Sequence, residues 1–175
     1  MGLKIKAVLI AGGAILIFVF VTGMNYRVPP EIIRSPDPRL HTPSIQVELV
    51  NDSTADIAKR LQDTLRKIDH PMNLFGLGLA TPQIGENQRI IIVKDHYQEY
   101  ITMINPEITE KRWLMPWTER CLSTKGRYFL KRYMWVKVNY QKIDGLKKEK
   151  TFFGPKAAIL QQEINHLNGV LISDK

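Results

Sequence analysis

An uncharged apolar run near the amino terminus places the strongest constraint on how this 175-residue chain folds. Residues 7–23 read AVLIAGGAILIFVFVTG, and Lys4 and Lys6 stand just before them. As a helix, this run would span about 25 Å, close to the ~30 Å hydrocarbon core of a bilayer. The run is apolar on every face, which disfavours a helix that packs on a core and also meets water. We therefore predict a membrane segment over residues 1–26, which leaves one ordinary domain for the rest of the chain.

Two roles for this segment remain open from the sequence. It is either an uncleaved single-pass anchor or a cleaved signal peptide, for which Val21 and Gly23 offer small residues at a cleavage site. The length of the run favours the anchor, so the predicted location is the membrane. The two lysines in front favour export of the domain, whereas three arginines behind the run, up to Arg39, favour the opposite orientation. Export is therefore only weakly favoured.

The rest of the chain predicts an α+β fold with a mainly antiparallel sheet. A Pro-rich linker over residues 27–37 is expected to lead into a single domain over residues 38–175. Asp52 or Ser53 can cap an amphipathic helix that runs to about Asp69. Strands are expected over residues 89–93, 100–104, 136–140 and 146–153.

The boundaries of the later elements are read from turn and cap residues. The pair Asn105-Pro106 predicts a turn that ends the second strand, and Asp144-Gly145 predicts a tight hairpin turn. A last helix is expected to begin at Pro155 and to end just before Gly169. The expected order of elements is therefore one helix, several strands and a last helix.

Positive charge is concentrated in the second half of the chain. The net charge is +8, and residues 111–150 alone hold twelve Lys or Arg against three Asp or Glu. Such a stretch can attract nucleic acid or anionic lipid, but a solvated sheet face is the simpler interpretation, and no nucleic-acid-binding motif accompanies it. We therefore expect no specific nucleic-acid binding. The single cysteine, Cys121, excludes a disulfide within the chain.

The last helix holds a group of residues with the spacing of a metal site. Gln162 and His166 are four residues apart and share one helix face, and Glu163 lies beside them. In the H-E-x-x-H pattern two histidines bind a metal ion and the glutamate handles a proton, but here Gln162 stands in place of the first histidine. Taken alone, this pattern is more typical of a surface glutamate and a partly buried histidine. The single cysteine is also a weak signal by itself.

Three segments taken together are far more specific. GLGLATPQIG at residues 76–85, ERCLS at 119–123 and QQEINHLNGVL at 161–171 occur in an order and spacing that resemble peptide deformylase. The resemblance runs from about Asp37 to the end of the chain. It implies a peptide-deformylase-like fold, in which antiparallel sheets surround the carboxy-terminal helix that bears the third motif. The activity that the resemblance implies is removal of the formyl group from N-formylmethionyl peptides or nascent chains. It also implies one divalent metal ion, natively Fe(II), with Zn, Ni or Co as substitutes.

The resemblance also implies a role for individual residues. Cys121 and His166 correspond to metal ligands, and Gln162 occupies the place of the third. Glu163 corresponds to the general base and acid, while the Gln83 side chain and the Leu122 backbone N–H correspond to the groups that hold the oxyanion. The pocket for the methionine side chain would involve Leu77, Gly78, Trp117, Ala158 and Ile159.

Departures from the family pattern fall close to these residues. A glutamine offers a neutral amide oxygen where imidazole is the stronger ligand, so metal affinity is expected to fall by about 10–100-fold or more. Arg120 and Lys125 also replace the usual Gly and Pro, and further changes occur at Thr81 and Asn165. The favoured function is a deformylase whose activity is weak or lost. The alternatives are a catalytically inactive deformylase-like peptide-binding protein at a membrane, and an interaction module whose basic face binds lipid or RNA.

Overall fold

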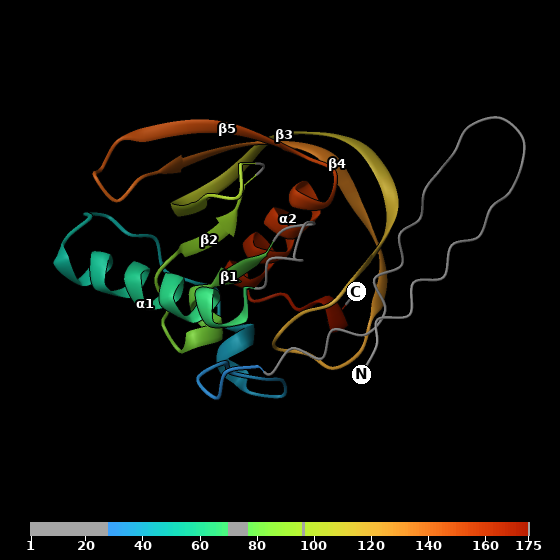
Figure 1. Ribbon diagram of the computed structural model, residues 1–175, viewed down its shortest axis with the longest axis horizontal. Helices are drawn as coiled ribbons and strands as arrows, with labels where there is room; N and C mark the ends of the chain where they lie inside the picture. The colour runs from blue at the N-terminus through green and yellow to red at the C-terminus, as the bar shows by residue number, and fades with distance from the viewer. Residues whose placement is uncertain (1–27, 70–76, 96, 175) are drawn as a thin grey trace, which may run out of the picture.

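The structure is a computed structural model that describes residues 28–69, 77–95 and 97–174. Its centre is a five-stranded antiparallel sheet in the order β1-β2-β3-β4-β5. The strands are β1 (Gly78–Ala80), β2 (Ile90–Lys94), β3 (Tyr100–Glu119), β4 (Tyr128–Gln141) and β5 (Lys147–Phe153). Two α-helices, α1 (Asp52–Ile68) and α2 (Pro155–Leu167), and three short 3-10 helices, η1 (Pro38–His41), η2 (Thr81–Ile84) and η3 (Ile172–Asp174), complete the described part. The predicted α+β fold with an antiparallel sheet is confirmed, and Figure 1 shows the sheet curving over α2.

The strand β2 is buried on both of its faces. Side chains alternate along a strand, so Ile90 and Ile92 face the cluster built on α1, whereas Ile91 and Val93 face the cluster built on α2. All four side chains are at most 2% exposed. The strand predicted over residues 89–93 is therefore confirmed, and burial on both faces explains why the apolar residues 90–93 show no alternation.

Both predicted helices are confirmed, although one cap differs. The helix α1 is capped by Asn51, whose side-chain oxygen accepts from the Thr54 backbone N–H at 3.0 Å, so the expected cap at Asp52 or Ser53 is wrong. The reason is that the cap must keep an extended backbone, as Asn51 does, and Asp52 already lies within the helix. The helix α2 spans Pro155–Leu167, and Gly169 follows with a φ of 71°.

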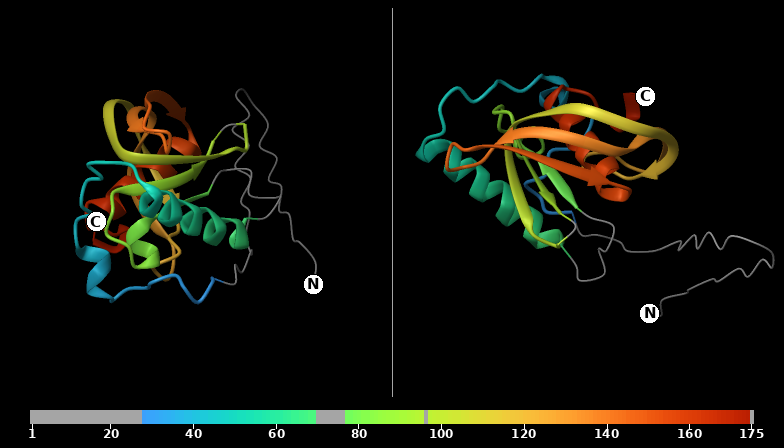
Figure 2. Two further views of the ribbon diagram at one scale, coloured as in Figure 1. Left: turned by 90° about the vertical axis from the view of Figure 1, so that its left-hand side faces the viewer. Right: turned by 90° about the horizontal axis from the view of Figure 1, so that it is seen from above.

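The expected turn at Asn105-Pro106 is wrong, because β3 continues through it to Glu119. A register shift between Ile104 and Glu107 absorbs the proline, which has no N–H for the ladder. The Asn105 side chain bonds both backbone groups of Val47, at 2.9 and 2.8 Å, and so replaces a strand partner there. Figure 2 shows the long β3–β4 hairpin, yellow to orange, twisting beyond the shorter strands.

No helix in the described ranges is long and apolar enough to cross a membrane. This finding contradicts the predicted membrane localisation, which is therefore corrected. The predicted transmembrane helix over residues 1–26 lies outside the described residues and stays a prediction. The helix α2 has only 13 residues, and α1 has a strongly charged outer face, so neither meets the requirement of about 20 apolar residues. The apolar run at residues 7–23 lies outside the described residues.

Candidate active site

The three motif segments meet around one cavity of about 480 Å³. The first segment supplies β1 and η2, the second follows the end of β3, and the third forms α2. Nine of the eleven predicted site residues line the cavity: Leu77, Gly78, Gln83, Trp117, Cys121, Leu122, Ile159, Gln162 and Glu163. His166 is fully buried behind Cys121, and Ala158 is fully buried without lining the cavity. Their individual roles stay predictions.

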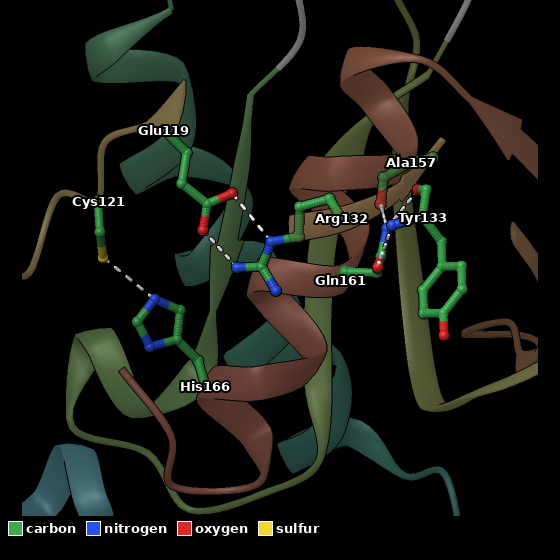
Figure 3. A network of polar contacts seen from close by, with 7 residues as sticks. All are labelled: Glu119, Cys121, Arg132, Tyr133, Ala157, Gln161 and His166. Atoms are coloured by element: carbon green, nitrogen blue, oxygen red, sulfur yellow. Dashed lines mark hydrogen bonds and ion pairs between the residues drawn. The ribbon is translucent and has the colours of Figure 1, made fainter. Parts of the chain in front are cut away.

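Cys121 and His166 lie close together at the inner side of the cavity. The Cys121 Sγ and His166 Nε2 atoms are 3.2 Å apart, although the residues come from the segment after β3 and from the last turn of α2 (Figure 3). The Ser123 backbone N–H also donates to Sγ at 3.3 Å. His166 Nδ1 is buried and has no hydrogen-bond partner among the described residues. The chain therefore holds a sulfur and a ring nitrogen close enough to bind the same metal ion.

Burial keeps both of these groups uncharged near neutral pH. It raises the pKa of Cys121 to about 12, and nearby Glu163 adds to that rise, while hydrogen bonds from Ser123, Thr124 and the Gln162 side chain oppose it. Burial likewise lowers the pKa of His166 to about 4, and the positive charge of Arg132 contributes. A buried thiol with a raised pKa is a poor nucleophile without a cation to replace its proton. The pair is therefore suited to metal binding rather than to direct attack.

Glu163 is an acidic residue of the cavity wall, and its carboxyl group is not held in an ion pair among the described residues. It is only 3% exposed, and burial together with the neighbouring Glu119 carboxylate raises its pKa to about 8. Its Oε2 atom is buried without a partner among the described residues. Gly78 allows β1 to pass beside this side chain, because a Cβ there would lie 2.7 Å from Glu163 Cγ. The carboxyl group therefore has one oxygen free to exchange a proton inside the cavity.

Gln83 is held in one orientation by bonds at both ends of its amide. Its Oε1 accepts from the Ala80 backbone N–H at 2.9 Å, and its Nε2 donates to Ser123 Oγ at 3.1 Å. The same Nε2 lies 3.9 Å from Cys121 Sγ. This arrangement directs an amide N–H towards the point where Cys121 and His166 meet.

A buried ion pair lies behind the site and was not predicted from the sequence. Arg132 of β4 donates from Nε to Glu119 Oε2 at 3.0 Å and from Nη2 to Oε1, and both side chains are at most 6% exposed. Figure 3 shows the guanidinium between Glu119 and α2. The glutamate belongs to the ERCLS motif, but its partner is identified only by the pairing of β3 with β4, which the sequence does not display.

The segment before η1 also contributes to the site. The Ile33 backbone N–H donates to Gln83 O at 2.8 Å, and the Ser35 N–H donates to Ser123 O at 2.9 Å. Arg34, between them, lines the cavity. Sequence reasoning placed this segment in a linker, and no local pattern indicates that it meets two motif loops. The predicted division at residues 37 and 38 stays a prediction.

The donors present fit one divalent ion with two strong protein ligands. Zinc lies about 2.3 Å from a thiolate and about 2.0 Å from an imidazole, so neighbouring ligands of one ion are roughly 3–3.6 Å apart, as Cys121 Sγ and His166 Nε2 are. Within the described ranges, no three His, Cys, Asp or Glu side chains form a metal-binding group. Gln162 lines the same cavity and hydrogen-bonds Cys121, so its amide is the third side chain available.

Comparison with known proteins agrees with this geometry. A sequence model of polypeptide deformylases matches residues 29–175. The chain belongs to this family. Members are metal-dependent hydrolases that act on N-formylmethionyl peptides and use a single divalent metal ion, typically Fe(II). The predicted resemblance is therefore confirmed.

Several relatives resemble most of the chain. A peptide deformylase from Desulfotalea psychrophila is 37% identical over 150 residues, which cover 82% of this chain and 85% of the relative. A peptide deformylase from Thermomicrobium roseum is 37% identical over 153 residues, which cover 82% of this chain and 84% of the relative. The crystal structure of the Thermotoga maritima peptide deformylase has a TM-score of 0.74 at 32% identity, covering 86% of this chain and 96% of that one.

Proposed function

We propose that this chain is a metal-dependent deformylase that removes the formyl group from N-formylmethionyl peptides, with reduced metal affinity. The observation that carries the proposal is the 3.2 Å approach of Cys121 Sγ to His166 Nε2 in a cavity that Gln83 and Glu163 also line. A similar structure, a peptide deformylase from Acinetobacter baumannii, has Met-Ala-Ser bound, with a TM-score of 0.71 at 27% identity over 82% of this chain and 95% of that one. That tripeptide begins with methionine, as a deformylated product would.

Cys121 and His166 would hold the metal ion, and the Gln162 amide oxygen would offer a third, weaker contact. Bound there, Fe(II), Zn, Ni or Co would act as a Lewis acid that polarises a carbonyl and makes water more acidic. An amide oxygen is a poorer ligand for these ions than imidazole. The expected consequence is an enzyme that loses its metal readily, not one that lacks the rest of its site.

The chain's own residues account for proton transfer and charge stabilisation. Glu163 would take a proton from the attacking water and deliver it to the leaving amine, because its side chain lines the cavity and its Oε2 has no partner among the described residues. Gln83 Nε2 would donate to the oxygen on which negative charge develops, and the Leu122 backbone N–H would be the second donor. The bonds of Gln83 to Ala80 and Ser123 hold its amide before the substrate arrives, which limits reorganisation.

Apolar side chains at the other side of the cavity would hold the methionine. Leu77, Trp117 and Ile159 line this part of the cavity, and Gly78 leaves room for the substrate backbone. Ala158 is fully buried and does not line the cavity, so we do not include it in this pocket.

The decisive experiment measures deformylation and metal content together. The full chain, prepared anaerobically with Fe(II) or Ni(II), is expected to release formate from formyl-Met-Ala-Ser. The variant Gln162→His is expected to bind the metal at least about tenfold more tightly, because imidazole replaces an amide oxygen, and to turn over faster.

A second variant tests whether Gln162 binds the metal ion or only fills space. Gln162→Leu has a similar volume and no donor atom, so it is expected to bind metal more weakly than the parent. If the metal-loaded parent and Gln162→His both fail to release formate, the catalytic proposal is overturned. If only Gln162→His is active, Gln162 has silenced an otherwise complete site.

A further inference from the structure

We infer that Arg34 and Lys125, with Arg120 beside them, form a carboxylate-binding subsite at the mouth of the cavity. This subsite would select formyl peptides that carry a negative charge after the methionine. The inference rests on the proposed function and adds to it a class of substrate.

The subsite lies where two cavities meet. The cavity of about 480 Å³ that contains Cys121 is also lined by Arg34, Arg120 and Lys125. A second cavity of about 260 Å³ shares two of these cations and has five hydroxyl-bearing residues in its lining, without an acidic side chain. Its lining residues are Arg34, Ser35, Ser123, Thr124, Lys125, Tyr128 and Ser173. Cations surrounded by hydroxyl donors are the usual surroundings of a bound carboxylate.

The three cations have no acidic partner among the residues that the structure describes. Ion pairs among the described residues involve other basic side chains, and none includes Arg34, Arg120 or Lys125. All three residues are exposed to solvent. Their charges are therefore available to a ligand.

The carboxylates nearest to this rim are occupied elsewhere. Glu119 lines the same cavity but is bound through both oxygens by Arg132. Glu163 is 3% exposed and packs deep in the cavity against Gly78. Neither carboxylate pairs with Arg34, Arg120 or Lys125. Among the described residues, the positive charge of these three side chains at the mouth of the cavity is therefore uncompensated.

The backbone holds two of the cations at fixed places relative to the reacting centre. Hydrogen bonds on both sides of Arg34 join its segment to Gln83 and Ser123. The carbonyl of Lys125 accepts from the Tyr128 hydroxyl at 3.0 Å. Thr124, which lines both cavities, has a buried hydroxyl without a partner among the described residues. Arg34 and Lys125 therefore form part of the same rigid frame as the site.

A bound peptide would bring its later residues to these cations. With its formyl group at Cys121 and its methionine against Leu77 and Trp117, the chain must leave the cavity past the rim. An acidic side chain after the methionine and the terminal carboxylate of a short peptide offer the same chemistry there. Attraction between exposed charges is screened over about 10 Å at 0.1 M salt, so the preference should depend on ionic strength.

The test compares four peptides with the metal-loaded full chain. Formyl-Met-Ala-Ser with a free carboxylate is paired with its carboxy-terminal amide, and the amides of formyl-Met-Asp-Ser and formyl-Met-Asn-Ser form the second pair. The charged member of at least one pair is expected to have a kcat/KM about fivefold higher or more at low salt, and the ratio is expected to shrink at about 0.5 M salt. The first pair reports the terminal carboxylate and the second an acidic side chain.

Variants tie the preference to the named residues. Arg34→Gln and Lys125→Gln are expected to bring the charged-to-neutral ratio towards one, mainly through KM. Lys148→Gln removes an exposed lysine of β5 that lines neither cavity, so it is expected to leave the ratio unchanged. A ratio of one in the parent, or a ratio that persists in both cavity variants, overturns the inference.

Peptide binding separates this inference from the proposed function. The same four peptides are titrated calorimetrically in parallel, so absence of turnover contradicts deformylation while the dissociation constants still test the subsite. Tighter binding of charged peptides that Arg34→Gln weakens supports the subsite. Equal or undetectable binding of all four peptides overturns it.

Discussion

At the scale of single residues, Glu163 links protonation to stability. Its pKa of about 8 lies well above the ordinary value near 4.5, so the folded protein binds this proton more tightly than the unfolded chain does. This contribution to stability is fully present below about pH 4.5 and is lost as the pH rises through 8. The cause is burial of the carboxyl group, to which repulsion from the Glu119 carboxylate adds.

The variant Glu163→Gln tests this linkage because its amide mimics the protonated carboxyl. For the metal-free protein, we expect a free energy of unfolding about 2–4 kcal/mol higher than the parent at pH 9, and nearly equal to it at pH 5. Urea unfolding at both pH values measures the difference. A difference that is independent of pH would show that the carboxyl is not buried in its protonated form.

A second residue-scale prediction concerns Gly78. A Cβ there would meet Glu163 Cγ at 2.7 Å and Ile159 Cγ2 at 2.9 Å, so Gly78→Ala must displace the proposed general base. We expect kcat to fall at least tenfold, while the free energy of unfolding falls by only about 1–3 kcal/mol. Turnover and urea unfolding, measured on the same preparation, distinguish a shifted base from an unfolded protein. Unchanged turnover would contradict the predicted role of Glu163.

At the scale of elements, the end of α2 depends on Gly169. This glycine has a φ of 71°, and a Cβ on it would lie 2.5 Å from His41 O. Gly169→Ala is expected to lower the free energy of unfolding by about 2–4 kcal/mol, because strain and a clash add. Gly126→Ala is the matched control, since Gly126 has a φ of 94° with open space around it. This variant is expected to lower the free energy of unfolding by only about 1–2 kcal/mol. Equal losses in thermal unfolding would contradict the clash.

Elements set by local patterns were predictable, and those set by distant contacts were not. The apolar run of β2, the amphipathic α1 and the caps of α2 are readable from a few neighbouring residues. The sequence predicts that the strand ends at Pro106, whereas β3 continues through it. The bulge that accommodates the proline depends on the contact of Asn105 with Val47, 58 positions away, which no local pattern indicates. The motif residues of the site were found from their spacing, whereas Arg132 and Arg34 reach it through strand pairing and segment packing.

At the scale of the whole molecule, one sheet separates two apolar clusters. Both are expected to support stability, but only one of them is expected to support metal binding as well. Leu61 of α1 lies in one cluster and Leu160 of α2 in the other, and both are fully buried. Leu61→Ala and Leu160→Ala are each expected to lower the free energy of unfolding by about 2–5 kcal/mol. Only Leu160→Ala is expected also to weaken metal binding, because α2 bears Gln162 and His166. Metal titration beside thermal unfolding measures both effects, and equal metal affinity in the two variants would contradict this division.

The hydrogen bonds from Ile33 and Ser35 to the motif loops have a practical consequence for protein engineering. A truncated protein that began at residue 38 would keep every motif residue, yet it would lack part of the lining of the candidate active-site cavity. Two backbone carbonyls of the motif loops, those of Gln83 and Ser123, would lose their partners, and one of the rim cations would be gone. A shortened protein for expression should therefore retain residue 29 and all residues after it. An amino-terminal affinity tag or protease site should be placed before residue 29.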